Sequence, residues 1–166
     1  MVSNFPKVFS SNNEFNTSFT FDVQITNTNI FLFTEKKIPL NINCHYEIEL
    51  QISNPGLIHI GIIDNIEQLP LENSCLVLTT KGDIIFENKL SEHNNRLIYD
   101  YQESKSIYGI SIQSNSFDDK MKVFFYTNKP SQIGKEYFIL KKLYRLFVLV
   151  EYGKGSLKML NFVVDD

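Results

Sequence analysis

Two neighbouring segments in which every second residue is apolar constrain the fold of this chain more than any other feature. Residues 46–52 (YEIELQI) alternate without interruption, and the sequence Ser53-Asn-Pro-Gly56 follows directly. Residues 57–63 then place a core stripe on one face, formed by Ile58, Ile60 and Ile62. A period of two residues is typical of a half-buried β-strand, and Pro and Gly supply the dihedral angles of a tight turn. The pattern therefore predicts two strands joined by a short turn.

Similar short segments recur along the whole chain, separated by polar, turn-rich stretches. Further strands are predicted at residues 19–25, 30–33, 75–80, 84–87, 107–113, 122–126, 146–151 and 157–164. The first two of these are expected to form a hairpin through the polar residues 26–29. Aromatic residues make up 13% of the chain, mostly as Phe and Tyr, and such side chains favour strands. Many short strands of this kind indicate an all-β antiparallel sandwich or barrel.

The length of 166 residues suits one domain with a substantial core. We expect a polar N-terminal arm at residues 1–17 and a β-sandwich domain at residues 18–166. Residues 136–147 admit two interpretations. They could form a basic amphipathic helix of the kind that binds membranes or partner proteins, or a loop that leads into a core strand with Lys141, Lys142 and Arg145 facing solvent.

Composition and charge argue against several classes of function. The net charge of −3 argues against a nucleic-acid partner, because binding phosphates requires a basic face. No segment approaches the ~20 apolar residues of a membrane span, and the N-terminus lacks the apolar region of a signal peptide. We therefore expect an intracellular, cytoplasmic protein. Cys44 and Cys75 form no Cys-x-x-Cys pair, so we expect reduced core residues and no disulfide, metal or cofactor.

Possible catalytic groups are few. Glu47 and Glu49 share one face of a strand, about 7 Å apart, which approaches the carboxylate spacing of glycosidases. Alternating Glu on the polar face of a strand is, however, what a solvated face looks like. The three histidines have neither metal-ligand spacing nor a neighbouring nucleophile motif, and His59 is expected on the outer face of its strand. The other two histidines are His45 and His93. We therefore expect no enzymatic activity.

Two loop motifs have structural interpretations. Gly153-Lys-Gly155 lacks the further positions of a phosphate-binding loop, so we interpret it as a hairpin turn. Asp118 and Asp119 could contribute to a calcium site, but one adjacent pair falls short of the six to eight oxygens that this ion prefers.

The strand-and-turn order of the chain resembles that of the SPRY domain, also called B30.2. The matching segments, which together extend over roughly residues 18 to 164, are Tyr46-Glu-Ile-Glu-Leu50, Gly56-Leu-Ile-His-Ile-Gly-Ile62, Thr80–Lys89, Ser106–Ile112, Met121–Lys129, Leu143-Tyr144 and Leu160-Asn161-Phe162. The segment Met121–Lys129 is the most specific match, to the family's hairpin of the type Gly-Thr-Ile-Ser-Phe-Tyr-Lys-Asn-Gly.

The chain also departs from the family pattern. It contains no Trp, whereas members usually carry Trp in the core and at the binding face. Arg145 stands where Pro is usual, and Gly is missing after Asn88 and Asn128. The resemblance implies a curved antiparallel sandwich of the concanavalin-like jelly-roll type, in which loops at one rim form a shallow site for a peptide or a partner protein.

On this basis the sequence predicts a non-enzymatic protein–protein interaction module, either an adaptor or a subunit of a larger assembly. The alternative is a carbohydrate-binding sandwich of the lectin type. Arg96, Tyr99 and Tyr101 belong to residue types that are enriched at binding hot spots, although the two tyrosines could equally pack against the sandwich. The full set of expected partner-binding residues is Asp64, Asn65, Arg96, Tyr99, Tyr101, Asn128 and Lys129, with the loop that begins at Asp64 expected beside the segment 94–101.

Overall fold

The computed structural model describes residues 7–9, 18–23, 30–34, 36–64, 74–95, 98–101, 105–127 and 132–165. These ranges contain twelve strands: β1 (Lys7–Phe9), β2 (Ser18–Val23), β3 (Ile30–Thr34), β4 (Asn43–Ile52), β5 (Leu57–Ile63), β6 (Ser74–Thr79), β7 (Asp83–Phe86), β8 (Lys89–His93), β9 (Ser106–Gln113), β10 (Lys120–Thr127), β11 (Gln132–Leu140) and β12 (Arg145–Asp165). The fold is therefore all-β, as the sequence predicts. No helix in these ranges has the length and apolar character needed to cross a bilayer.

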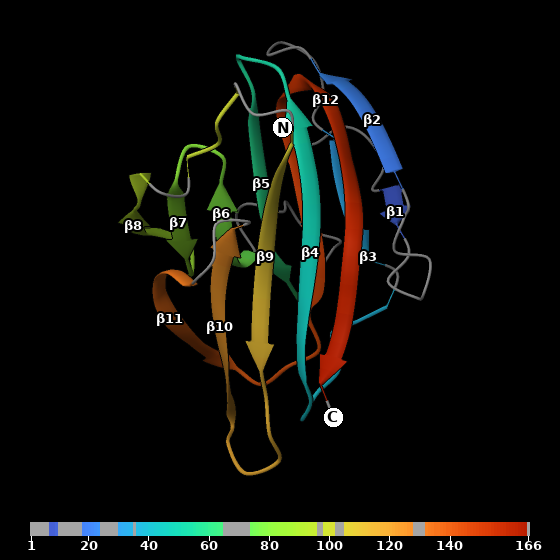
Figure 1. The fold of residues 1–166 in the computed structure, drawn as a ribbon. Coiled ribbons are helices and arrows are strands. Elements are labelled where there is room, and N and C mark those ends of the chain that lie inside the picture. Colours follow the sequence, from blue (N-terminus) through green and yellow to red (C-terminus); the bar gives the residue numbers. More distant parts are fainter. Residues whose placement is uncertain are drawn as a thin grey trace.

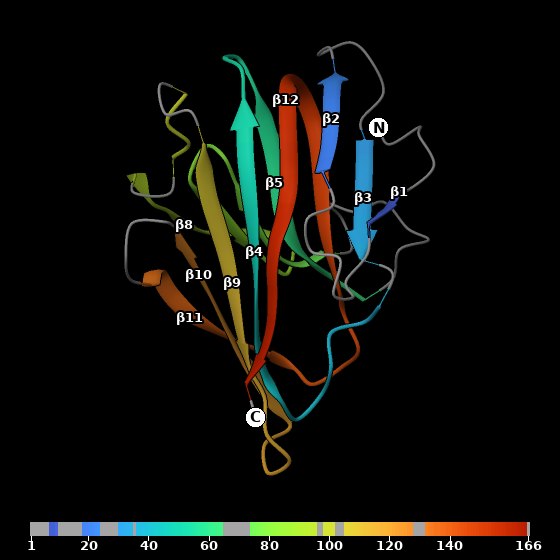
Figure 2. The same cartoon turned by 45° about the vertical axis from the view of Figure 1, so that its right-hand side comes forward.

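The strands form two curved sheets that share the long strand β12 (Figure 1, Figure 2). Residues 145–152 of β12 pair with β3 and β5, and sheet A continues through β6, β7 and β8. Residues 153–165 pair with β2 and β4, and sheet B continues through β9, β10 and β11. All of these pairs are antiparallel, and β1 joins the edge of sheet A parallel to β3. Thus Lys7–Phe9, which fall within the expected arm, pair with a strand of the sandwich.

The main core fills the space between the two sheets. The predicted stripe on β5 is buried there, with Ile58, Ile60 and Ile62 each at most 2% exposed. Facing it are alternate residues of β4, such as Tyr46 and Ile48. The alternation in the sequence therefore identifies the inner faces of both strands correctly.

A second apolar cluster lies on the opposite face of sheet A and comprises Phe31, Phe33, Ile63, Val77, Phe147 and Leu149. Both faces of this sheet are consequently buried in its central strands, β3, β12, β5 and β6. His59, which the sequence places on an outer face at the surface, is only 6% exposed. The strand face is as predicted, but that face is not solvated.

Three local predictions are wrong. Residues 19–25 and 30–33 do not form a hairpin, because β2 pairs with β12 in sheet B whereas β3 pairs with β12 in sheet A. The helix alternative for residues 136–147 is wrong, since β11 extends to Leu140 and β12 begins at Arg145. Residues 141–144 do form a loop that leads into a core strand, with Lys142 exposed, but Arg145 is half-buried rather than facing solvent. The Gly153-Lys-Gly155 segment is not a hairpin turn, because it lies inside β12 where that strand passes from one sheet to the other.

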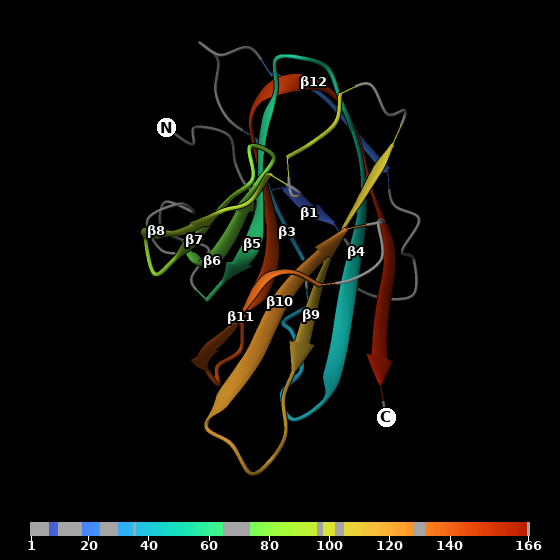
Figure 3. The same cartoon turned by 60° about the vertical axis from the view of Figure 1, so that its left-hand side comes forward.

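Strands β8 and β11 are the last strands of the two sheets, and Figure 3 shows both at the same side of the molecule. Side-chain contacts join them. The Tyr137 hydroxyl donates to the Glu92 carboxylate at 2.5 Å and lies 3.0 Å from Ser91 Oγ. The Lys135 N–H donates to the same carboxylate at 3.1 Å. These contacts nearly close the sandwich along one side.

Candidate partner-binding site

The strand β12 bends sharply where it leaves sheet A for sheet B, and glycine makes this bend possible. The pairing with β5 is irregular between Val150 and Tyr152, and Gly153 has a φ of 127°, in a region that L side chains rarely adopt. A Cβ on Gly155 would lie 1.9 Å from the Gln51 carbonyl oxygen. Glycine at these positions therefore lets β12 curve tightly against the end of β4.

The turn between β4 and β5 is attached to this bend by two hydrogen bonds between Ser53 and Lys154. The Ser53 N–H donates to the Lys154 carbonyl at 2.8 Å, and the Lys154 N–H donates to Ser53 Oγ at 3.1 Å. The peptide bond between Asn54 and Pro55 is cis. The turn and the bend consequently form one fixed piece of surface at this end of the sandwich.

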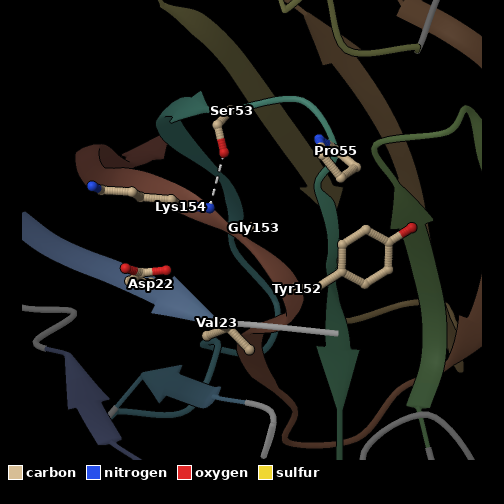
Figure 4. Close-up of a pocket in the computed structure, with 7 residues that line it drawn as sticks. All are labelled: Asp22, Val23, Ser53, Pro55, Tyr152, Gly153 and Lys154. Carbon is tan, nitrogen blue, oxygen red and sulfur yellow. Dashed lines mark hydrogen bonds between the residues drawn. The ribbon is translucent and has the colours of Figure 1, made fainter. Parts of the chain in front are cut away.

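A shallow pocket of about 170 Å³ opens between the turn, the bend and strand β2 (Figure 4). Its walls are formed by Asp22, Val23, Ser53, Pro55, Tyr152, Gly153 and Lys154. Figure 4 shows Pro55 and Tyr152 on one side of Gly153, and Asp22 and Lys154 on the other. The last two are register partners across β2 and β12. One side of the pocket is therefore formed by the Tyr152 ring and Pro55, and the other side carries the charged Asp22 and Lys154.

Tyr99 and Tyr101, two residues of the predicted site, make hydrogen bonds to the backbone beside this turn. The Tyr99 hydroxyl accepts a hydrogen bond from the Ile52 N–H at 2.9 Å and lies 3.3 Å from the Leu50 carbonyl, to which it donates. Tyr99 is 2% exposed, which favours the packing alternative that the sequence leaves open for it.

Tyr101 is half-buried, and its hydroxyl donates to the Gly56 carbonyl at 2.7 Å. Burial raises its pKa, and the nearby Tyr152 hydroxyl raises that pKa further, while the Gly56 hydrogen bond and Lys81 lower it. The ring of Tyr101 meets that of Tyr99 edge-on, with centroids 5.0 Å apart. Tyr101 thus holds the end of the turn through Gly56 and packs against the main core, and it does not line the pocket.

The other predicted site residues are not brought together with Tyr101 by the described part of the chain. Asp64 follows the far end of β5, so the seven residues of that strand separate it from the turn that Tyr101 contacts. Its carboxylate lies 3.4 Å from Lys142 Nζ. The expected proximity of Asp64 to the segment 94–101 is therefore not found for Tyr99 and Tyr101. Asn65, Arg96, Asn128 and Lys129 lie outside the described residues.

Sequence reasoning missed most of the pocket lining. The sequence correctly predicts the tight turn that contains Pro55, but it predicts a hairpin turn at Gly153-Lys-Gly155, where β12 continues. Asp22 lies on a strand that was expected to pair elsewhere. The pairing of β2 and β4 with the second half of β12 brings these residues together, and no local pattern in the sequence encodes that pairing.

The residues weighed as catalytic make ordinary contacts on strands. His59 Nε2 lies 2.7 Å from Glu151 Oε2, and this hydrogen bond lowers the pKa of Glu151. Glu47 lies 3.8 Å from His45, and Glu49 lies 3.5 Å from Lys105.

The remaining candidate ligands are Asp118, Asp119 and the two cysteines. Asp118 accepts a hydrogen bond from the Asn115 amide at 2.9 Å. No group of three His, Cys, Asp or Glu side chains in the described ranges could hold a metal ion. Cys44 and Cys75 are free thiols, the first buried and the second half-buried, and burial raises the pKa of Cys75 to about 11.

Comparison with known proteins identifies the fold through structure alone. No protein-family model matches the sequence, and no curated protein matches it either. Among solved structures, the SPRY domain of human HERC1 superimposes with a TM-score of 0.55 at 8% identity, over 78% of this chain and 80% of that one. The TRIM65 PSpry domain gives a TM-score of 0.50 at 11% identity, over 76% of this chain and 68% of that one.

A lectin domain is similar to about the same degree. The carbohydrate recognition domain of Emp46p, in its metal-free form, gives a TM-score of 0.54 at 12% identity, over 90% of this chain and 89% of that one. The two kinds of domain share the curved two-sheet architecture described above. The resemblance to SPRY domains that the strand order suggests is thereby confirmed at the level of structure. The chain has a diverged SPRY-like β-sandwich fold.

Proposed function

We propose that this protein is a non-enzymatic interaction module that binds a short segment of a partner protein in the pocket between the β4–β5 turn and the bend of β12. The proposal includes an intracellular setting, as an adaptor or as a subunit of a larger assembly. The observation that carries it is a small pocket on a rigid piece of backbone, with Pro55 and Tyr152 beside the charged Asp22 and Lys154.

The size of the pocket favours a protein segment over a small molecule. Sites for small molecules and cofactors usually enclose about 300–1,000 Å³, whereas this pocket encloses about 170 Å³. It suits one side chain of a bound segment, with the flanking residues of that segment lying over the rim. Tyrosine is enriched at hot spots, and Tyr152, which lines the pocket, is only half-buried.

The test starts from the tagged full-length protein, recovered from its own cell and analysed by mass spectrometry for stoichiometric partners. Tyr152→Ala and Lys154→Glu should each reduce recovery of the partner. Lys154 is exposed, so its substitution leaves the core intact. Lys89→Ala, on the exposed strand β8, is the matched control and should not change recovery.

Circular dichroism of each purified variant separates a loss of binding from a loss of folding. If folded Lys154→Glu and Tyr152→Ala proteins recover the partner as well as the wild type does, the pocket is not the site. Recovery of glycans, without any protein partner, would contradict the proposed class of function.

A carbohydrate ligand is the second candidate, and one feature of the outer face of sheet B favours it. The Tyr126 ring lies over Gly109, where an added Cβ would meet the ring at 2.0 Å. The His45 ring is 6.4 Å from that of Tyr126. Burial raises the pKa of Tyr126, and the charge of the neighbouring Glu47 raises it further. An aromatic ring flanked by a carboxylate and an imidazole offers stacking and hydrogen bonds to a sugar. Glycan-array binding that Tyr126→Ala abolishes would support this alternative over the first.

A further inference from the structure

Strand β11 is the edge of sheet B and is longer than the edge strands of sheet A. Among the described strands it pairs only with β10 (Figure 3). It has nine residues, whereas β1 and β8 have three and five. The unpaired N–H and C=O groups of an edge strand are a template for another strand, and natural proteins shield them with short strands, charged side chains or bulges. The way in which β11 is shielded therefore shows where a strand can be added.

The shielding of β11 covers only its first half. The pairing with β10 is irregular there, and the Lys135 N–H and the Tyr137 hydroxyl are both attached to Glu92 of β8. The segment Tyr137-Phe-Ile-Leu140, in contrast, pairs regularly with β10 and contains no charged residue. The second half of the edge is consequently regular and unshielded.

At alternate residues of this second half, the backbone groups point away from β10. The Lys141 N–H donates to the Asp119 carbonyl at 2.9 Å, so Lys141 and every second residue before it direct their N–H and C=O groups towards β10. Phe138 and Leu140 therefore direct theirs towards the free edge, where the Leu140 carbonyl accepts from the Tyr144 hydroxyl at 2.8 Å. The Phe138 N–H, the Phe138 carbonyl and the Leu140 N–H are in place to bond an added strand.

The side chains of the same two residues are exposed on the outer face of sheet B. Phe138 is 56% and Leu140 55% exposed, whereas Tyr137 and Ile139, which alternate with them, are 2% exposed. Apolar surface stabilises a protein only when it is removed from water, and exposed apolar side chains on an unshielded edge strand mark an association site. The backbone groups and the apolar side chains thus identify the same short segment as an interface for a β-strand.

This segment is complementary to a second copy of itself. When two β11 strands pair antiparallel about a two-fold axis beside Ile139, Phe138 of each copy lies opposite Leu140 of the other. Both residues direct backbone groups to the shared edge, and side chains opposite each other in such a pair, with Cβ atoms about 5 Å apart, pack together. A two-fold interface between identical chains requires a segment that matches itself in this way.

The charges at the two ends of the segment also match in this pairing. Glu136 lies opposite Lys142 of the second copy, and their side chains are 39% and 51% exposed. On its own chain Glu136 lies 3.7 Å from Lys122, and Lys142 lies 3.4 Å from Asp64. Such surface pairs are weak, so both side chains are able to take a partner on the second copy.

The other lysines near the segment do not meet one another across the axis. Lys122 and Lys120 are the register partners of the two apolar residues on β10. Each is separated from the corresponding lysines of the second copy by three strand spacings, about 14 Å. Lys135 Nζ lies 5.2 Å from the centre of the Tyr137 ring, and Lys141 Nζ donates to two oxygen atoms of neighbouring loops.

We propose that this protein forms a two-fold symmetric dimer, in which residues 137–140 of two β11 strands pair antiparallel and join the two B sheets into one. The dimer goes beyond the function proposed for the pocket, which is formed by β2, the β4–β5 turn and β12. Each dimer presents two such pockets. A partner that carries two copies of the bound segment should therefore bind more tightly than a partner with one.

The mass of the purified full-length protein, measured by analytical ultracentrifugation through the micromolar range, tests the proposal first. The wild type should sediment as a dimer. Phe138→Lys should raise the dissociation constant of the dimer about tenfold or more, because it places a charge at the centre of the interface. Phe117→Lys is the matched control, since Phe117 is 94% exposed on the β9–β10 loop, and it should leave the dimer intact. Circular dichroism checks that both variants are folded.

Zero-length carbodiimide cross-linking tests the register of the two strands. In a mixture of isotopically light and heavy protein, mass spectrometry distinguishes cross-links between copies from those within one copy. The expected product joins Glu136 of one copy to Lys142 of the other. The pair Glu136 and Lys122, 3.7 Å apart on one chain, is the internal control and should be cross-linked within a single copy.

Any of the following results would overturn the proposal. One is a monomer throughout this range of concentration, and another is a Phe138→Lys protein that dimerises as tightly as the wild type. A third is the absence of a cross-link between Glu136 and Lys142 of different copies. Tyr152→Ala should change neither the mass nor the cross-link, so the dimer and the pocket can fail or succeed separately.

Discussion

At the scale of single residues, Tyr99 shows how a side chain of the predicted rim can be needed for structure. Its hydroxyl bonds to the backbone at Leu50 and Ile52, just before the β4–β5 turn. Tyr99→Phe should lower the free energy of unfolding by about 1–2 kcal/mol, because the buried Ile52 N–H would lose its acceptor. Urea denaturation measures this change. An unchanged midpoint would show that these bonds do not hold the turn.

Glu151 gives the protein a dependence of stability on pH. The hydrogen bond from His59 lowers the pKa of Glu151, so ionised Glu151 stabilises the folded state above the ordinary pKa of a Glu, and this contribution is lost as pH falls through the lowered pKa. Glu151→Gln should therefore be less stable than the wild type at pH 7. The difference should shrink as pH falls towards 3 in urea denaturation. A difference that grows on acidification would contradict this account.

The residue scale also shows what local pattern can predict. Alternation in residues 46–52 and 57–63 identifies the buried positions of β4 and β5, and Cys44 lies in the main core, as expected. The burial of His59 could not be predicted in this way. It depends on an apolar cluster on the outer face of sheet A, to which three other strands contribute.

At the scale of elements, the bend in β12 determines where the pocket lies. Gly153 has a φ of 127°, and a Cβ there would lie 2.9 Å from Ile52 Cδ1. Gly153→Ala should cost about 1–3 kcal/mol of stability and should weaken partner binding, because the pocket wall would shift. Ser156→Ala, three residues along the same strand, is the control and should change stability by less than about 0.5 kcal/mol. Thermal denaturation measures both variants. If Gly153→Ala and Ser156→Ala lower the stability equally, the bend tolerates a side chain at position 153 and this account is contradicted.

Two strands, β8 and β12, were not predicted with their observed bounds, because their local sequence patterns are ambiguous. Strand β8 is an edge strand with mostly exposed side chains, so no alternation of apolar and polar residues marks it. The two halves of β12 were predicted as separate strands, because glycines between them are also typical of a turn. Whether such glycines reverse the chain or bend one strand depends on the strands that pair beside them.

Turn chemistry adds a related example at the β7–β8 connection. SPRY domains usually carry Gly after the position of Asn88, and this chain does not. Glu87 and Asn88 themselves adopt positive φ values of 50° and 65°, as the tight turns of hairpins require. The hairpin therefore forms despite the departure from the family pattern.

At the scale of the whole molecule, β12 makes the sandwich one cooperative unit, because it pairs within both sheets. Leu146 faces the main core and Leu149 the outer cluster, and both are fully buried. Substituting either by Ala should cost about 2–5 kcal/mol. Each variant should still unfold in a single transition, with coincident curves from circular dichroism and from tyrosine fluorescence. Separate transitions for the two variants would indicate that the sheets unfold independently.

The overall architecture could be predicted from the sequence because two independent signals agree: strand periodicity and the order of segments that resembles SPRY domains. The solved SPRY structures confirm the fold. The location of a binding site could not be predicted equally well, since the pocket is built from β2, the β4–β5 turn and β12. These segments are distant in sequence, and only their pairing brings them together.

The central claim is that the pocket at the bend of β12 binds a protein segment, and hydrogen–deuterium exchange of the purified complex tests it most directly. The account predicts that the partner slows exchange in residues 53–56 and 150–154, and that Lys154→Glu removes this protection in a protein that remains folded. Protection confined to the outer face of sheet B, or no protection at the turn and the bend, would contradict it.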